Sequence, residues 1–147
     1  IMATISMDAK TYKELSSPGF NKLASYIFGS NEGEKKIAMT SPVHMDINDS
    51  MSSMSFVMPA DYNLDNLAKP NDSTIKLEKS ADEYMAAIQF GGFANDDEIK
   101  KYASKLEEAL KRSGINYYGN FRFLGYNAPF QLLARRHEIV VNVQWNQ

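Results

Sequence analysis

Apolar residues recur at the three- and four-residue spacing of an amphipathic helix in two stretches of the chain. The first stretch opens with Ser17-Pro18, because serine is a good N-cap and proline fits the first helical turn, and it closes before Gly29. Its apolar positions share one face, which we expect to be buried: Phe20, Leu23, Ala24 and Ile27. The opposite face is expected to stay accessible, and it carries Lys22, Ser25 and Tyr26.

The second stretch has signals at both ends. Asn95 is a good N-cap and forms a capping box with Glu98, while Gly114 is typical of a residue just beyond a helix. Its apolar stripe consists of Ile99, Tyr102, Ala103, Leu106 and Leu110. The pattern therefore predicts a second helix that begins after Asn95 and ends at Gly114.

Most of the remaining chain alternates between apolar and polar residues with a period of two, which is typical of strands. The segment from Asp61 to Pro70 interrupts this alternation and is a polar connector. The expected strands are residues 2–7, 37–47, 54–58, 74–79, 84–90, 117–126 and 138–145.

The order of the expected elements repeats along the chain. Each helix ends at a glycine, and the strand after it leads into a small residue followed by proline, Ser41-Pro42 and Ala128-Pro129. We therefore expect an α+β domain over residues 1–147, built from pseudo-symmetric duplicated βαββ units at about residues 1–60 and 73–147. Its strands would form a distorted antiparallel β-barrel flanked by two helices. The first repeat would lack its opening strand, which is expected before Ile1, and would leave an exposed edge.

Composition narrows the class of partner. The 147 residues carry 16 basic and 18 acidic side chains, so a net charge of −2 gives no electrostatic reason to expect nucleic acid. No apolar run approaches the roughly 20 residues that span a bilayer. There is no cysteine, which excludes disulfides and thiolate chemistry. The chain starts at Ile1, so a leader peptide could lie upstream, and the sequence leaves the compartment and the oligomeric state open.

Catalytic and metal-binding motifs are missing from the sequence. It has no glycine-rich phosphate loop, HExxH motif or nucleophile elbow, so we name no catalytic residue. The carboxylates that follow Asn95 are explained by helix capping and the helix dipole. His44 and His137 do not form a metal site without further ligands, and a solvent-facing strand position is the simpler interpretation of His44.

Several blocks, taken in order, resemble the SOUL haem-binding protein family. They are Gly19-Phe20-Asn21-Lys22-Leu23, the run from Lys36 to Val43, Phe90-Gly91-Gly92-Phe93, the run from Gly125 to Phe130, and Arg135-Arg136-His137-Glu138-Ile139. Together they cover nearly the whole chain. The resemblance implies a pseudo-symmetric α+β barrel with two helices, in agreement with the repeat.

The resemblance also implies a shallow apolar groove for tetrapyrroles, between the first helix and the loop before the last strand. Its residues would be Lys22, Tyr26, Tyr126, Ala128, Pro129, Phe130, Arg135 and Arg136. Of these, arginines present a fork of donors that suits carboxylates. We expect non-covalent haem binding of weak to moderate affinity, without a strong axial ligand from the protein.

An alternative is an effector-binding or hydrolytic domain similar to the gyrase-inhibitor family, which shares the duplicated βαββ design and binds hydrophobic small molecules in a cleft. That function requires a buried glutamate, for which Glu78 and Glu138 are the candidates. The alternation along a strand does not determine which of them points inward.

Overall fold

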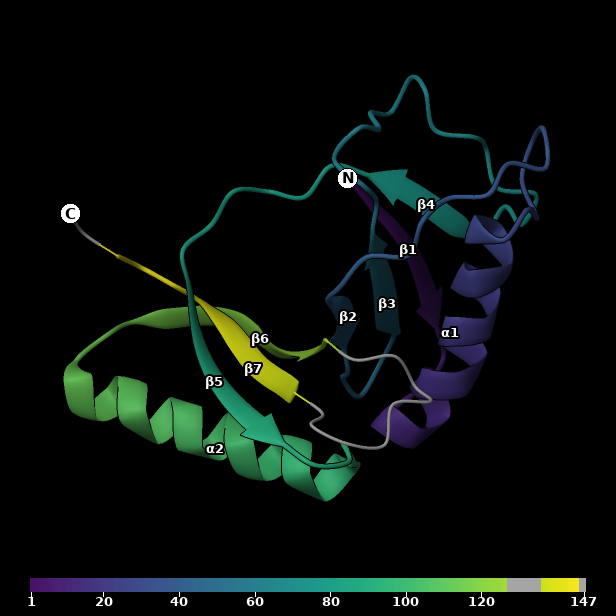
Figure 1. Ribbon diagram of the computed structural model, residues 1–147. Coiled ribbons are helices and arrows are strands. Elements are labelled where there is room, and N and C mark those ends of the chain that lie inside the picture. The colour runs from purple at the N-terminus through teal and green to yellow at the C-terminus, as the bar shows by residue number, and fades with distance from the viewer. Residues whose placement is uncertain (127–135, 146–147) are drawn as a thin grey trace. The chain divides into compact units, whose positions relative to one another are not determined.

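The computed structural model describes residues 1–126 and 136–145. The chain divides into two compact units, Ile1–Ala81 and Asp82–Gln147, each described by itself (Figure 1). The described residues form two helices and seven strands, which makes the protein an α+β protein as expected. No helix among them is both long and apolar enough to cross a membrane.

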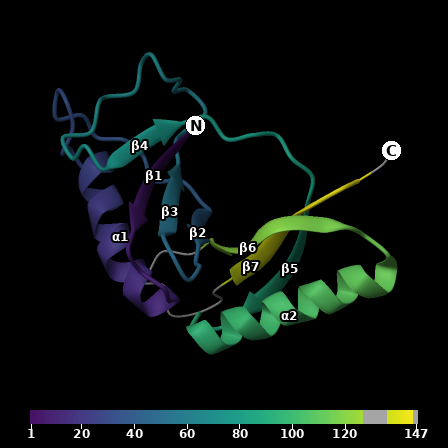
Figure 2. The same cartoon turned by 180° about the vertical axis from the view of Figure 1, so that it is seen from behind.

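The first unit packs one helix on a four-stranded antiparallel sheet. In chain order its elements are β1 (Met2–Met7), α1 (Tyr12–Ile27), β2 (Val43–Asp46), β3 (Ser52–Val57) and β4 (Ile75–Glu78). The strands lie side by side in the order β4-β1-β3-β2. Helix α1 lies along β1 and β3 (Figure 2), and the rings of Phe20 and Phe56 meet with centroids 5.4 Å apart.

Helix α1 begins earlier than the sequence pattern predicted. Its N-cap is Thr11, whose hydroxyl accepts a hydrogen bond from the Glu14 backbone N–H at 3.1 Å, and Pro18 lies inside the helix. The Ser17-Pro18 start was therefore wrong, because the Thr11–Glu14 capping box supplies the true start signal, nearly two turns nearer the N-terminus. The C-terminal end was predicted correctly, since the helix ends at Ile27, two residues before Gly29.

The buried face of α1 is wider than expected. Leu23, Ala24 and Ile27 are buried as predicted, whereas Phe20 is half-buried. Tyr26 was expected to be accessible but is fully buried, which corrects that prediction. Gly19 is buried as well, and a Cβ atom there would lie 3.2 Å from the Met54 side chain, so glycine lets the helix approach β3 closely.

Strand β4 was expected to open the second repeat but pairs with β1 of the first unit. The register places Ile5 opposite Ile75, and β3 pairs with β1 on the other side. Strand β1 therefore has two neighbours, and the expected exposed edge at β1 was wrong. The physical reason is that pairing depends on which apolar faces meet in space, and adjacency along the chain is only a guide to it.

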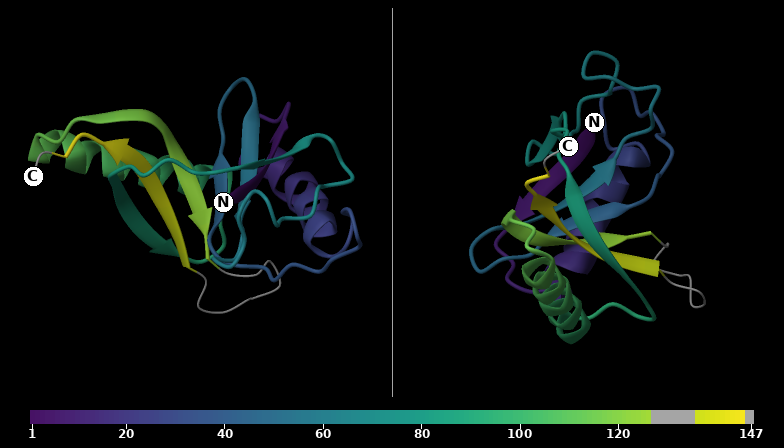
Figure 3. Two further views of the ribbon diagram at one scale, coloured as in Figure 1. Left: turned by 90° about the horizontal axis from the view of Figure 1, so that it is seen from above. Right: turned by 90° about the vertical axis from the view of Figure 1, so that its left-hand side faces the viewer.

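The second unit repeats the arrangement of one helix on an antiparallel sheet. Its elements are β5 (Met85–Gly91), α2 (Asp96–Ser113), β6 (Tyr117–Gly125) and β7 (Arg136–Val143). The strands lie in the order β5-β7-β6, and α2 runs along one face of them (Figure 3). Neither unit closes its own sheet, since β4 and β2 bound the first and β5 and β6 bound the second.

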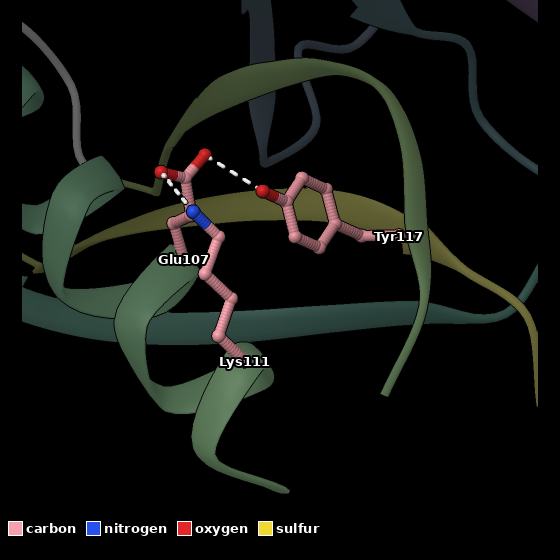
Figure 4. Close-up of polar contacts among 3 residues, drawn as sticks. All are labelled: Glu107, Lys111 and Tyr117. Atoms are coloured by element: carbon pink, nitrogen blue, oxygen red, sulfur yellow. Dashed lines mark hydrogen bonds and ion pairs between the residues drawn. The ribbon is translucent and has the colours of Figure 1, made fainter. Parts of the chain in front are cut away.

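Helix α2 has the ends that the sequence predicted. The Asn95 side chain accepts a hydrogen bond from the Glu98 N–H at 2.9 Å, and Gly114 adopts the left-handed conformation with φ 69°. A polar contact ties the helix to β6, because Tyr117 donates to Glu107 at 2.9 Å and Lys111 pairs with the same carboxylate (Figure 4). These contacts lower the pKa of Glu107, first through the Tyr117 hydrogen bond and then through the charge of Lys111.

Candidate ligand-binding site

The outer face of α1 borders a shallow depression in the first unit. Lys22 and Ser25 are exposed on this face, and the cavity volume is about 400 Å³. The lining residues come from α1, the loop after it, the segment before β4 and the start of β4: Lys22, Ser25, Tyr26, Ser30, Asn71, Asp72 and Ile75. The lining combines apolar surface with polar groups, which include the Lys22 cation and the Asp72 carboxylate.

Tyr26 is fixed beneath this depression. Its hydroxyl donates a hydrogen bond to the Ala68 carbonyl at 2.7 Å, and burial, followed by the neighbouring Tyr62, raises its pKa. The backbone carbonyl of Tyr26 accepts from the buried Asn31 amide at 2.7 Å. The phenol is therefore protonated and held by the fold, which does not suit a phenolate ligand to iron.

A second group of predicted residues meets in the second unit. Tyr126 follows β6 and Arg136 begins β7, and the Tyr126 N–H donates to the Arg136 carbonyl at 3.3 Å. The Arg136 guanidinium carbon lies 4.2 Å from the centre of the Tyr126 ring, which is cation–π stacking.

Glu138 and Gln89 extend this group across the sheet. The Gln89 amide lies 3.5 Å from the Glu138 carboxylate. Burial, then the hydrogen bond and the negative charge of Glu138, raise the pKa of Tyr126 to about 12, against the opposing charge of Arg136. The phenol therefore stays protonated at neutral pH.

The two histidines have different surroundings. His137 is buried in the second unit with its Nε2 atom 2.8 Å from the Gly92 carbonyl, so Nε2 carries the proton. Its ring lies 5.2 Å from each of the rings of Phe90 and Phe123. His44 is half-buried on β2, while the next residue Met45 is buried, as the strand alternation predicted.

Comparison with known proteins decides the family. The family described as "SOUL heme-binding protein" matches residues 1–142. The chain belongs to the SOUL haem-binding protein family. Heme-binding protein 1 of Xenopus laevis is 30% identical over 141 residues, which cover 90% of this chain and 73% of that protein.

Two further relatives of this SOUL protein carry a related name. Heme-binding protein 2 of Mus musculus is 30% identical over 129 residues, covering 82% of this chain and 62% of that protein. Heme-binding protein 2 of Homo sapiens is 28% identical over 142 residues, which cover 91% of this chain and 69% of that protein. The SOUL chain thus spans between 62% and 73% of the length of these three relatives.

The predicted groove residues of the SOUL protein fall into three groups. Lys22 and Tyr26 belong to the first unit, whereas Tyr126 and Arg136 are brought together in the second. The remaining predicted residues lie outside the described part of the chain: Ala128, Pro129, Phe130 and Arg135. Across residues 1–126 and 136–145, no three His, Cys, Asp or Glu side chains cluster as a metal site.

The buried carboxylate expected for a gyrase-inhibitor-like cleft is not Glu78, which is exposed at the end of β4. Glu138 is half-buried, and its carboxylate lies 3.5 Å from the Gln89 amide. Gln89 had not been singled out from the sequence. Only the register of β5 against β7, which sets it opposite Glu138, identifies its role.

Proposed function

We propose that this chain binds haem or a closely related tetrapyrrole without a covalent bond, and carries or buffers it in a shallow groove. The observation that carries the proposal is the match of the SOUL family over residues 1–142. Relatives at about 30% identity have names that state haem binding. The groove would use the outer face of α1 together with the segment from Tyr126 to Arg136.

The described residues suit the polar edge of a haem. Haem carries two propionates, and charge-assisted hydrogen bonds from lysine or arginine are the strong way to hold a carboxylate. Lys22 is exposed beside the α1 depression, and Arg136 is exposed where it stacks on Tyr126. The apolar face of the ring would rest on Ala128, Pro129 and Phe130, with Arg135 as a further cation.

Neither Tyr26 nor His137 is arranged to bind the haem iron. The Tyr26 hydroxyl donates to the Ala68 carbonyl, and the His137 Nε2 proton is directed to the Gly92 carbonyl. A bound haem would supply an iron centre with a strong Soret absorbance, and we propose that its attachment depends on apolar contact and on the cations. We therefore expect the chain to bind haem with weak to moderate affinity. The free energy gained by burying apolar surface must first offset the translational and rotational freedom lost on association.

Haemin titration of the full chain, followed at the Soret band, tests the proposal. We expect saturable binding that Phe130→Glu weakens by at least tenfold, because a charge would have to be buried against the ring. His44→Ala serves as the matched control and should leave the band position and affinity unchanged. Wild-type protein without saturable binding of haemin or other porphyrins would refute the proposal.

We also propose that the two units arose by duplication of a βαββ element, and that together their strands form the barrel implied by the family. The order strand–helix–strand–strand occurs in both units. In both, the last of these strands lies between the other two, β1-β3-β2 and β5-β7-β6. An experimentally determined structure in which β1–β3 with α1 cannot be superposed on β5–β7 with α2 would count against the duplication.

A further inference from the structure

Strand β5 forms an open edge of the sheet in the second unit. Within residues 1–126 and 136–145 its one strand neighbour is β7, whereas β1 in the first unit has β3 on one side and β4 on the other. The seven residues of β5 include neither a charged residue nor a proline. Charged side chains and proline commonly keep an edge strand from pairing with another chain, so their absence leaves this edge suited to pairing.

The hydrogen-bond pattern identifies the residues of β5 that face the open edge. The Val143 N–H donates to the Tyr84 carbonyl at 2.9 Å, in the register that joins β7 to β5. Bonded and non-bonded pairs alternate along an antiparallel ladder, so Met85, Ala87 and Gln89 direct their backbone N–H and C=O groups away from β7. All three residues are exposed.

Strand β1 matches β5 in sequence and in hydrogen-bond phase. It begins Met-Ala-Thr-Ile, and β5 begins Met-Ala-Ala-Ile. The Met58 N–H donates to the Ile1 carbonyl at 2.8 Å, so Met2 and Thr4 direct their backbone groups away from β3 and toward β4. The open edge of β5 therefore corresponds, residue by residue, to the edge of β1 that β4 covers.

Burial differs between the two strands at their matching apolar positions. Ala3 and Ile5 of β1, which has β4 beside it, are 0% and 1% exposed. Their counterparts in β5, Ala86 and Ile88, are only half-buried. A strand added to the open edge would remove this remaining apolar surface from water, which favours association.

A cavity of about 270 Å³ borders the start of β5. Its lining contains no charged residue and consists of Tyr84, Met85, Ala86, Ile115, Val143 and Trp145. Directly opposite residues of paired strands point to the same face of a sheet. An apolar residue paired with Ala86 would therefore lie next to this cavity.

We propose that the open edge of β5 binds an extended segment of a partner polypeptide as an additional antiparallel strand. Strand β4 supplies the pattern of that segment, because its sequence Ile-Lys-Leu-Glu places apolar residues opposite Ala3 and Ile5. The partner segment accordingly has apolar residues opposite Ala86 and Ile88, with charged residues between them. Main-chain hydrogen bonds give such a complex its affinity, and the alternate side chains give it specificity. This site does not depend on haem binding.

A fluorescein-labelled peptide with the sequence of residues 72–80 is the probe, and fluorescence anisotropy during titration with the full chain measures Kd. We expect saturable binding. N-methylation of the Lys76 amide, which faces β1 when β4 is paired, should weaken binding about tenfold or more, because the ladder loses a donor. N-methylation of Leu77, whose amide points away from the ladder, is the matched control and should change Kd by less than about twofold. Leu77→Gln in the peptide should weaken binding about tenfold, because less apolar surface is buried.

Two substitutions at one position of the protein locate the peptide. Ala87→Pro removes an N–H that faces the open edge, where proline is tolerated, and should weaken binding about tenfold or more. Ala87→Ser keeps this N–H and should bind the peptide as wild type does. Loss of binding in Ala87→Pro alone places the peptide on β5 and excludes its exchange with β4 on β1. Circular dichroism verifies that both variants fold, and the N-methylated peptides test the ladder on wild type regardless.

Three results would overturn the inference. Wild type that shows no saturable binding has no peptide site at this edge. Equal affinity for the two N-methylated peptides shows that no strand is added to the ladder. If the peptide does not bind while the chain forms dimers that Ala87→Pro abolishes in sedimentation velocity, the occupant of the edge is a second copy of the chain.

Discussion

At the scale of single residues, two tyrosines show how the fold assigns different roles to the same side chain. Tyr26 is buried and anchors α1 to the Ala68 carbonyl. Tyr126 is half-buried, and its ring lies 4.2 Å from the Arg136 guanidinium carbon. Both have a raised pKa, with burial as the largest cause. The neutral phenol is therefore part of the native structure at both positions.

The raised pKa of Tyr126 predicts a loss of stability at alkaline pH. Between the ordinary tyrosine value of 10.0 and the folded value of about 12, the unfolded chain releases this proton while the native state keeps it. The native state then binds more protons, so the free energy of unfolding falls as pH rises through this window. Urea unfolding at pH 9, 10 and 11 measures the slope, and Tyr126→Phe should make it shallower. Equal slopes in the two proteins would contradict the assignment.

The buried face of α1 predicts a large effect at Leu23. This side chain is 0% exposed, so Leu23→Ala should lower the free energy of unfolding by about 2–5 kcal/mol through lost transfer energy and a residual cavity. Lys22→Ala changes the exposed neighbour and should alter stability by no more than about 0.5 kcal/mol. Chemical denaturation measures both, and a small effect at Leu23 would show that the helix buries another face.

At the scale of elements, capping signals decide where each helix begins. Both helices start with a side-chain acceptor that binds the N–H three residues on, Thr11 in α1 and Asn95 in α2. In α1, a second set of start signals at Ser17-Pro18 lies inside the helix. The helix nevertheless extends through Pro18, which cannot donate a backbone hydrogen bond. Burial of Leu15 and Gly19 against the sheet offsets the loss of that bond.

Paired substitutions at the two competing start positions test this account. Thr11→Ala should cost about 1 kcal/mol, because the Glu14 N–H loses its acceptor. Ser17→Ala should be neutral or slightly stabilising, because alanine is the better residue inside an exposed helical turn. Thermal or urea unfolding compares them directly, and the reverse order of effects would place the N-terminus of the helix at Ser17.

At the scale of the whole molecule, ligand binding is expected to add stability to the native state. A ligand that binds only the native state stabilises it by an amount set by its concentration relative to Kd. Haemin at about 100 times its Kd should therefore raise the free energy of unfolding by about 2.7 kcal/mol. Differential scanning fluorimetry detects this as a rise in Tm, which should shrink for Phe130→Glu at the same haemin concentration. A rise of equal size in both proteins would indicate nonspecific association.

The sequence by itself determined the features that local interactions control. The ends of α2 follow from Asn95, Glu98 and Gly114, whose capping contacts lie within a few residues of each other. The α+β class follows from the periodicity of apolar positions. The order of the sequence blocks was sufficient to indicate the SOUL family, which the match over residues 1–142 establishes. The family resemblance also indicated Tyr126 and Arg136 as candidate groove residues, and their side chains are in contact in the structure.

Only the tertiary structure decided the features that depend on partners far along the chain. The burial of Tyr26 requires Ala68, and the pairing of β4 with β1 joins strands separated by α1, β2 and β3. The contact between Gln89 and Glu138 requires the register of β5 against β7. Helical periodicity and strand alternation specify which residues of one segment share a face. Which strand lies opposite that face depends on burial over the whole core, so it cannot be predicted from a single segment.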